Sequence, residues 1–116
     1  MMYLLIIFIQ LFFIQSDPIN MTGTWVYQAP TAPPAYQEGE IQVSKDNDGN
    51  ITVEVVFGEY RIPTSGVKVD KNKLSFSFSI EGAYIPLSLE FKGASFKGQA
   101  DTPDGYVLLT GKKKKE

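Results

Sequence analysis

Strict alternation of apolar and polar residues constrains the fold of this chain more than any other feature. It is clearest in the segment Lys73–Ile80, where every second residue is apolar and serines lie between them. Side chains alternate across an extended chain, so this pattern predicts a β-strand with one buried face and one wet face. We expect it to be a central strand, and its inward face consists of Leu74, Phe76, Phe78 and Ile80.

Similar short segments follow one another from Thr22 onward, separated by clusters of Gly, Pro, Asn and Asp that are typical of turns. None of them has the spacing of an amphipathic helix. We treat the segments on either side of Pro63 and Gly66 as one kinked strand, because proline and glycine interrupt regular pairing. The expected strands are then eight in number, at 22–27, 40–44, 51–57, 59–70, 73–80, 85–91, 95–100 and 106–111.

The turns between these segments are short, which favours a meander of neighbouring strands over a sandwich. A meander leaves two exposed edges unless its first and last strands pair, and about eight strands can close a small barrel. We therefore expect an all-β fold, an eight-stranded antiparallel up-and-down meander that is closed or nearly closed into a barrel. At its seam we expect Trp25 beside Val107 and Leu109, with the stem of Lys112 or Lys113 over the indole.

The first residues, Met1–Ile14, are almost wholly apolar. A membrane-spanning helix needs about 20 such residues, whereas this length is typical of the hydrophobic helix of a secretion signal. No Lys or Arg precedes the run and no Ala-x-Ala follows it, but Ser16 is small enough to precede a cleavage site. We expect a signal peptide over 1–16, a single barrel domain over 17–116 without a membrane span, and a secreted or periplasmic location. The alternative is an uncleaved N-terminal helix that anchors the chain in a membrane.

The composition argues against most kinds of catalysis. The chain has no His and no Cys, so the usual general base, the thiolate nucleophile and the soft metal ligands are missing. The carboxylates, such as Glu54 and Glu59, fall in turns or at outward positions, where solvation explains them. We expect no catalytic site and no cofactor. The formal net charge of −2 gives no reason to expect a nucleic-acid partner.

The acidic turn Asp46–Asn50 invites a comparison with calcium loops. In the frame of an EF-hand that starts at Asp46, Ile51 takes the place of the glycine and Phe57 takes the place of the closing glutamate. The match fails at both positions, so we interpret the segment as a hairpin turn and expect no metal site.

Several short motifs along the chain resemble those of a known kind of barrel. They are Gly23-Thr24-Trp25, Asp48-Gly49-Asn50, Lys73-Leu74-Ser75-Phe76-Ser77-Phe78, Phe91-Lys92-Gly93, Phe96-Lys97-Gly98 and Leu109-Thr110-Gly111-Lys112-Lys113. In this order they resemble the lipocalin-like (calycin-type) barrels, and more closely a small module of secreted bacterial proteins. The resemblance implies a non-catalytic barrel whose last strand places a basic residue on the Trp. It also implies the binding of apolar ligands that is seen in larger members.

Two main functions remain open for such a barrel. The first is a secreted, non-catalytic binding or accessory module whose partner is a glycan or a protein. Exposed Tyr27, Tyr36 and Tyr60 beside the proline-rich loop would supply its surface. The alternative is a carrier that holds a small hydrophobic ligand inside the barrel. Large inward aromatics usually mean a filled core, whereas a cavity of about 300 Å³ or more would favour the carrier. The candidate ligand-binding residues are Trp25, Tyr36, Phe57, Tyr60, Phe76, Phe78 and Phe91.

The proline-rich segment Ala29–Ala35 is predicted to be a loop, because three prolines so close together can hold neither a helix nor a ladder. We consider two interpretations of it. It is either a stiff surface connection or a lid over one end of the fold.

Overall fold

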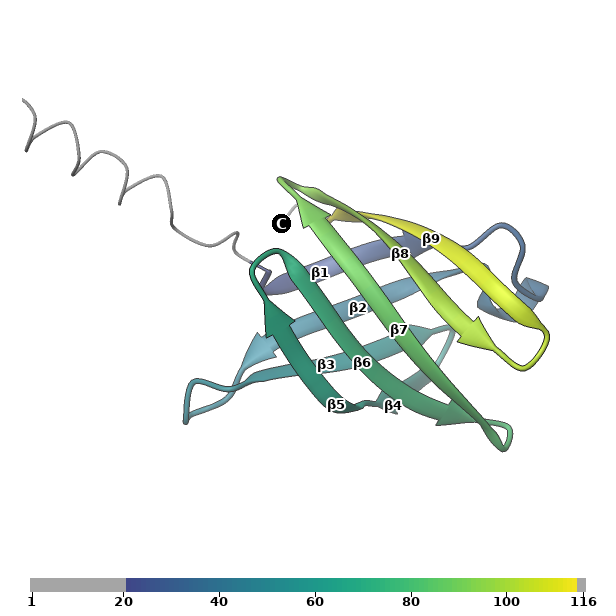
Figure 1. Cartoon of the computed structure of the whole chain (residues 1–116), viewed down its shortest axis with the longest axis horizontal. Coiled ribbons are helices and arrows are strands. Elements are labelled where there is room, and N and C mark those ends of the chain that lie inside the picture. The colour runs from purple at the N-terminus through teal and green to yellow at the C-terminus, as the bar shows by residue number, and fades with distance from the viewer. Residues whose placement is uncertain (1–20, 115–116) are drawn as a thin grey trace, which may run out of the picture.

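The computed structural model describes residues 21–114, and all of its strands belong to one antiparallel sheet (Figure 1). The strands are β1 (Gly23–Gln28), β2 (Glu38–Lys45), β3 (Ile51–Phe57), β4 (Tyr60–Pro63), β5 (Ser65–Asp70), β6 (Lys73–Ile80), β7 (Ala83–Lys92), β8 (Ser95–Thr102) and β9 (Gly105–Lys113). The predicted signal helix and its cleavage site near Ser16 lie outside the described residues. Among residues 21–114, no helix is long and apolar enough to cross a membrane.

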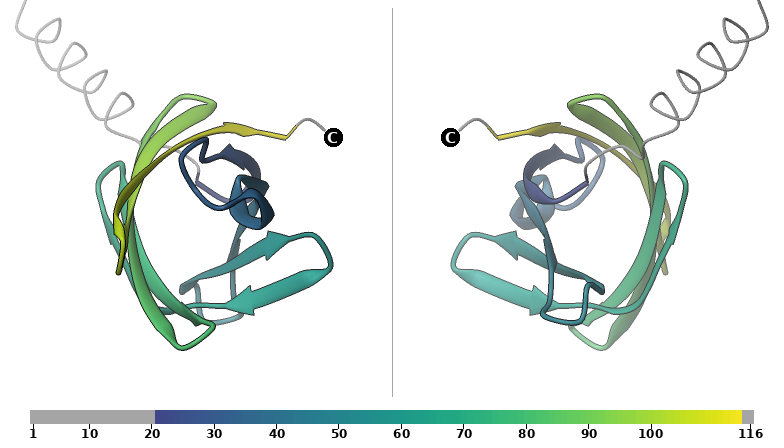
Figure 2. Two further views of the ribbon diagram at one scale, coloured as in Figure 1. Left: turned by 90° about the vertical axis from the view of Figure 1, so that its right-hand side faces the viewer. Right: turned by 90° about the vertical axis from the view of Figure 1, so that its left-hand side faces the viewer.

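The sheet curls into a barrel because its first and last strands are neighbours (Figure 2). The strand order is β4-β3-β2-β1-β9-β8-β7-β6-β5, so every strand except the two at the ends is paired on both sides. β1 pairs with β9 antiparallel, with Trp25 opposite Lys113 and Tyr27 opposite Gly111. The meander and the pairing of its first and last strands are therefore confirmed.

The structure has nine strands where the sequence predicted eight. The segment expected to be one kinked strand changes partners at Thr64: β4 pairs with β3, and β5 pairs with β6. The hydroxyl of Thr64 donates a 2.7 Å hydrogen bond to the carbonyl oxygen of Val53, and the register of β5 shifts between Ser65 and Lys68. The barrel is nearly closed at this corner, because β4 and β5 are consecutive in the chain but share no ladder.

The strand β6 follows the predicted alternation with two differences. Leu74 and Phe76 are buried, and Phe78 packs half-buried against the core, as the pattern predicted. The expectation of a wet face fails at Ser77, which is only 6% exposed, because its hydroxyl lies 3.4 Å from the carbonyl oxygen of Ser65 on β5. The strand is also not central, since only β5 separates it from the end of the sheet.

One end of the barrel is filled by aromatic side chains around Trp25, which is fully buried. The indole meets Phe91 edge-on at 4.7 Å and Phe96 at 5.9 Å between ring centroids, and its Nε1 donates a 2.8 Å hydrogen bond to the carbonyl oxygen of Met21. Gly111 permits this packing, because a side chain there would overlap the Phe96 ring. This end therefore has the close packing of an ordinary protein core.

The seam differs in register from the expectation. Lys113 Nζ lies 5.7 Å from the centroid of the Trp25 ring, so the predicted lysine over the indole is present. Val107 and Leu109 are not the strand partners of Trp25, because Trp25 faces Lys113 in the ladder and Leu109 lies four residues further back along β9. Leu109 instead belongs to the opposite end of the barrel, where it lines a cavity.

Candidate functional site

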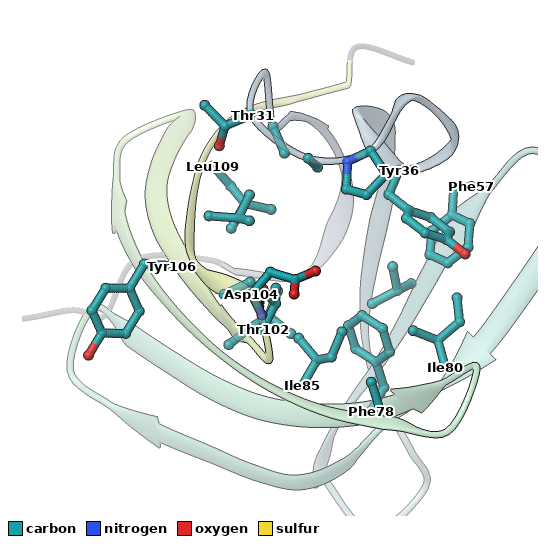
Figure 3. A pocket seen from close by; sticks show the side chains of 18 of the residues that line it. Thr31, Tyr36, Phe57, Phe78, Ile80, Ile85, Thr102, Asp104, Tyr106 and Leu109 are labelled. Atoms are coloured by element: carbon teal, nitrogen blue, oxygen red, sulfur yellow. Dashed lines mark hydrogen bonds between the residues drawn. The ribbon is translucent and has the colours of Figure 1, made fainter.

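The end of the barrel opposite Trp25 is hollow. A cavity of about 570 Å³ opens there, lined by the ends of β6 and β8, the beginnings of β7 and β9, and the loop that follows β1 (Figure 3). This end is hollow because the inward side chains there are smaller than those at the packed end. Along β7 and β8, the packed end carries Phe91 and Phe96, whereas the hollow end carries the smaller Ile85 and Ala100.

The wall of the cavity is mostly apolar. Apolar surface predominates over polar surface in its lining, and the aromatic residues of the lining are Tyr27, Tyr36, Phe57, Phe78 and Tyr106. In Figure 3 the side chains of Phe78, Ile80, Ile85 and Leu109 surround the opening, whereas Tyr106 points away from it. The apolar wall also includes Ile41, Val55, Leu87, Ala100 and Val107.

The proline-rich loop covers part of the cavity mouth. It contains a single turn of 3₁₀-helix, η1 (Pro34–Tyr36), which was not predicted, and Ala29, Ala32 and Tyr36 from this loop line the cavity. The amide of Ala29 donates a 2.7 Å hydrogen bond to the carbonyl oxygen of Gln37, which closes the loop at its base. The loop therefore forms part of the cavity wall, as the lid interpretation requires.

Tyr36 ties this loop to the opposite rim. Its ring packs edge-on against Phe57 at 5.0 Å between centroids, and its hydroxyl donates a 2.7 Å hydrogen bond to Oε1 of Glu81. Glu81 and Gly82 both have positive φ, at 52° and 82°, which forms the tight turn between β6 and β7 and places Glu81 at the mouth. The mouth is thus bridged by one side-chain hydrogen bond between two surface loops.

Two tyrosines at the cavity have perturbed acidity. Burial raises the pKa of Tyr27 to about 12, and its hydroxyl donates a 3.1 Å hydrogen bond to the carbonyl oxygen of Tyr36. The hydrogen bond to Glu81 raises the pKa of Tyr36, with burial and the negative charge of Glu81 adding to the effect. Both phenols therefore stay protonated at neutral pH, and both donate their protons within the protein.

The structure divides the seven sequence-predicted ligand-binding residues into three groups. Tyr36, Phe57 and Phe78 come together in the cavity lining. Trp25, Phe76 and Phe91 are buried outside that lining, and Trp25 and Phe91 belong to the packed end. Tyr60 is 69% exposed on β4 and also lies outside the lining.

The proposed surface patch of three exposed tyrosines is not present, because Tyr27 is only 4% exposed. Tyr27 lies two residues after Trp25 on the same strand, so the alternation that turns the indole inward also turns this phenol inward. The inward position of Tyr27 could therefore have been predicted from the sequence. The prediction also missed Ile85, Ala100 and Leu109 as cavity residues, because alternation shows that a strand residue points inward but not that it lines a space. Glu81 and Asp104 at the mouth belong to turns, whose spatial neighbours depend on closure of the barrel.

No group of three His, Cys, Asp or Glu side chains that could hold a metal ion occurs among residues 21–114. In the acidic turn, Oδ1 of Asp46 accepts hydrogen bonds of 2.9 Å from the amides of both Asp48 and Asn50. That carboxylate therefore stabilises its own hairpin turn. Glu54 forms a 2.7 Å ion pair with Arg61 of the neighbouring strand β4, at an exposed position.

Comparisons with known proteins support the fold. No protein-family model and no curated protein matches the sequence. Among solved structures, the chain is similar to two single-residue mutants of the fluorescent protein UnaG, each with a TM-score of 0.53. The identities are 12% and 13%, and each alignment covers 83% of this chain and 97% of the UnaG chain. At this identity the similarity concerns the fold alone, so it supports the nearly closed antiparallel barrel and does not bear on a secreted bacterial module.

Proposed function

We propose that this protein is a non-catalytic carrier that binds one small hydrophobic ligand inside the barrel. The observation that carries the proposal is the cavity of about 570 Å³ at one end of the barrel. Cavities that bind small molecules have volumes of about 300–1,000 Å³ and are mostly apolar, with a few polar groups that orient the ligand. The mostly apolar wall, with Tyr27, Tyr36 and Glu81 as polar groups, matches that description.

The division of the barrel into a packed end and a hollow end supports the same proposal. The aromatic cluster around Trp25 provides stability without a ligand, so the hollow end can stay open. A carrier also needs an entrance, and the mouth beneath the proline-rich loop supplies one. The alternative of a surface module for glycans or proteins is less well supported, because Tyr27, one of the three tyrosines of its aromatic patch, is buried.

The proposal includes export of the protein, with a signal peptide over 1–16 and a secreted or periplasmic site of action. Its support is the apolar run Met1–Ile14 followed by the small residue Ser16. Mass spectrometry of the protein recovered from its native host would test this part separately. An N-terminus close to Asp17 is expected, and an intact Met1 would favour the anchored alternative.

Fluorescence titration with a neutral apolar dye, N-phenyl-naphthylamine, tests the carrier function. We expect one dye molecule to bind per chain, with an increase in dye emission, because the cavity excludes water. The variant Ala100→Phe places a ring in the cavity and should weaken dye binding at least about tenfold, because it removes volume that the ligand needs. Ala94→Phe, at an exposed turn outside the lining, is the matched control and should bind like wild type. Circular dichroism establishes that both variants are folded, and equal dye binding by two folded variants would refute the carrier proposal.

A further inference from the structure

The charged residues at the cavity are all of one sign. Within residues 21–114, the only charged residues in the lining are Glu81, in the turn between β6 and β7, and Asp104, in the turn between β8 and β9, and neither Lys nor Arg takes part. The chain also has no His, and its one arginine, Arg61, is engaged with Glu54 and Gln42 away from the cavity. The mouth therefore presents negative charge and offers no counter-ion for a ligand carboxylate.

Three hydroxyl groups at the cavity strengthen this preference, because their protons are already donated within the protein. Tyr27 donates to the carbonyl oxygen of Tyr36, Tyr36 donates to Glu81, and Thr102 donates a 2.7 Å hydrogen bond to the carbonyl oxygen of Gly105. Tyr36 occupies only Oε1 of Glu81, which leaves Oε2 able to accept from a ligand. The polar groups of the site are thus mainly hydrogen-bond acceptors. They can bind only a ligand that donates hydrogen bonds.

We propose that the ligand is an amphiphile with a cationic, hydrogen-bond-donating head such as a primary ammonium group, and that the cavity discriminates against carboxylates. This inference rests on the carrier function proposed above and specifies its ligand. The apolar body lies among Phe78, Ile85 and Leu109, and the head lies at the mouth, which Glu81 and Asp104 line. Both carboxylates are exposed, so the apolar body supplies most of the affinity and the charge supplies the selectivity.

Three ligands with the same decyl chain test the proposal: decylammonium, decanol and decanoate. Their affinities are measured by displacement of the neutral dye at neutral pH, low salt and concentrations below micelle formation. We expect decylammonium to bind about fivefold or more tighter than decanol, and decanoate to bind most weakly, since each exposed ion pair contributes about two- to fivefold. Added salt should reduce the difference between decylammonium and decanol, because the charges are exposed.

Variants locate the source of the selectivity. In the double variant Glu81→Gln/Asp104→Asn, the preference for decylammonium over decanol should fall to within about twofold. The double variant Glu59→Gln/Glu90→Gln removes the same charge from exposed positions outside the lining, and should keep the wild-type preference. An equal loss in both double variants would overturn the proposal, because the preference would then come from the overall charge of the protein.

The outcomes separate this inference from the carrier function. If decanol binds and decylammonium binds no more tightly, or if decanoate binds most tightly, the proposal of a cationic ligand is refuted and the carrier proposal is retained. If none of the three ligands nor the dye binds to folded protein, both proposals are refuted.

Discussion

Tyr36 and Glu81 lie 45 residues apart in the chain, and a 2.7 Å hydrogen bond from the Tyr36 hydroxyl to Glu81 Oε1 joins them across the mouth of the cavity. The bond links the proline-rich loop to the turn between β6 and β7. It is exposed to solvent, so its contribution to the free energy of unfolding is small. Its position is suited to control how fast a ligand enters and leaves.

The first prediction concerns this bond. Tyr36→Phe keeps the ring that packs on Phe57 but removes the hydroxyl, so the loop should open more often. We expect the association and dissociation rates of the neutral dye to rise together by about two- to fivefold, with little change in melting temperature. Stopped-flow fluorescence measures both rates. Tyr60→Phe, outside the cavity lining, is the control, and unchanged rates in Tyr36→Phe would show that the bond does not hold the mouth closed.

The second prediction concerns the seam between β1 and β9. Trp25 is the only tryptophan and is fully buried, so its emission should be blue-shifted in the folded protein. Truncation after Asp104 deletes β9, and should red-shift the emission and promote aggregation through the exposed edge of β1. Truncation after Gly111 deletes Lys112 and Lys113, which form two of the four rungs of the seam, so we expect a partial red shift. Wild-type emission and solubility after removal of all of β9 would contradict closure at this seam.

The third prediction separates the packed and hollow ends. Phe76 is buried in the core outside the cavity lining, so Phe76→Ala should lower the free energy of unfolding by about 3–5 kcal/mol. Phe78 is only half-buried and lines the cavity, so Phe78→Ala enlarges an existing space and should cost clearly less. Urea unfolding of the two variants measures the difference. Equal losses would mean that the cavity is filled by packing in solution.

The fourth prediction concerns alkaline pH. Burial raises the pKa of Tyr27 from 10.0 to about 12, so the unfolded chain releases this proton at a lower pH than the folded chain does. The stability that the neutral phenol contributes is fully present below pH 10 and is lost as the pH rises toward 12. Tyr27→Phe has no phenol to ionise, so it should show no such loss; at neutral pH its lack of the hydrogen bond to the Tyr36 carbonyl should lower its stability by about 1 kcal/mol.

We therefore expect wild type to lose stability relative to Tyr27→Phe over this alkaline range. Denaturant unfolding of both proteins at neutral pH and between pH 10 and 12 measures it. Every other ionisable side chain is present in both proteins, so the comparison isolates Tyr27. Parallel pH dependences in the two proteins would show that this phenol is solvated.

The barrel could be predicted from sequence because local signals and closure agree. Alternation placed Phe76 and Phe78 inward, turn residues separated the strands, and pairing of the ends followed from the cost of open edges. The register at the seam was not predictable in the same way. It depends on how Gly111 makes room for Phe96, which is a packing relationship between two strands.

The cavity was harder to predict than the barrel. Alternation shows which side chains point inward but not whether they fill the space, so Phe91 and Phe78 looked equivalent in sequence. The structure places Phe91 against Trp25 and Phe78 in the cavity wall. Glu81 and Asp104 carry no sequence signal of a site, because turns of this kind are commonly acidic for solubility alone.

The position of a neutral ligand in the folded protein decides whether the barrel interior is a binding site. Intermolecular NOEs between decanol and the isotope-labelled protein report which side chains touch the decyl chain. The account predicts NOEs to Ile85 and Leu109, which line the cavity, and none to Leu74 or to Phe91 at the packed end. NOEs confined to exposed residues such as Leu108, or none at all at saturating decanol, would contradict binding inside the barrel.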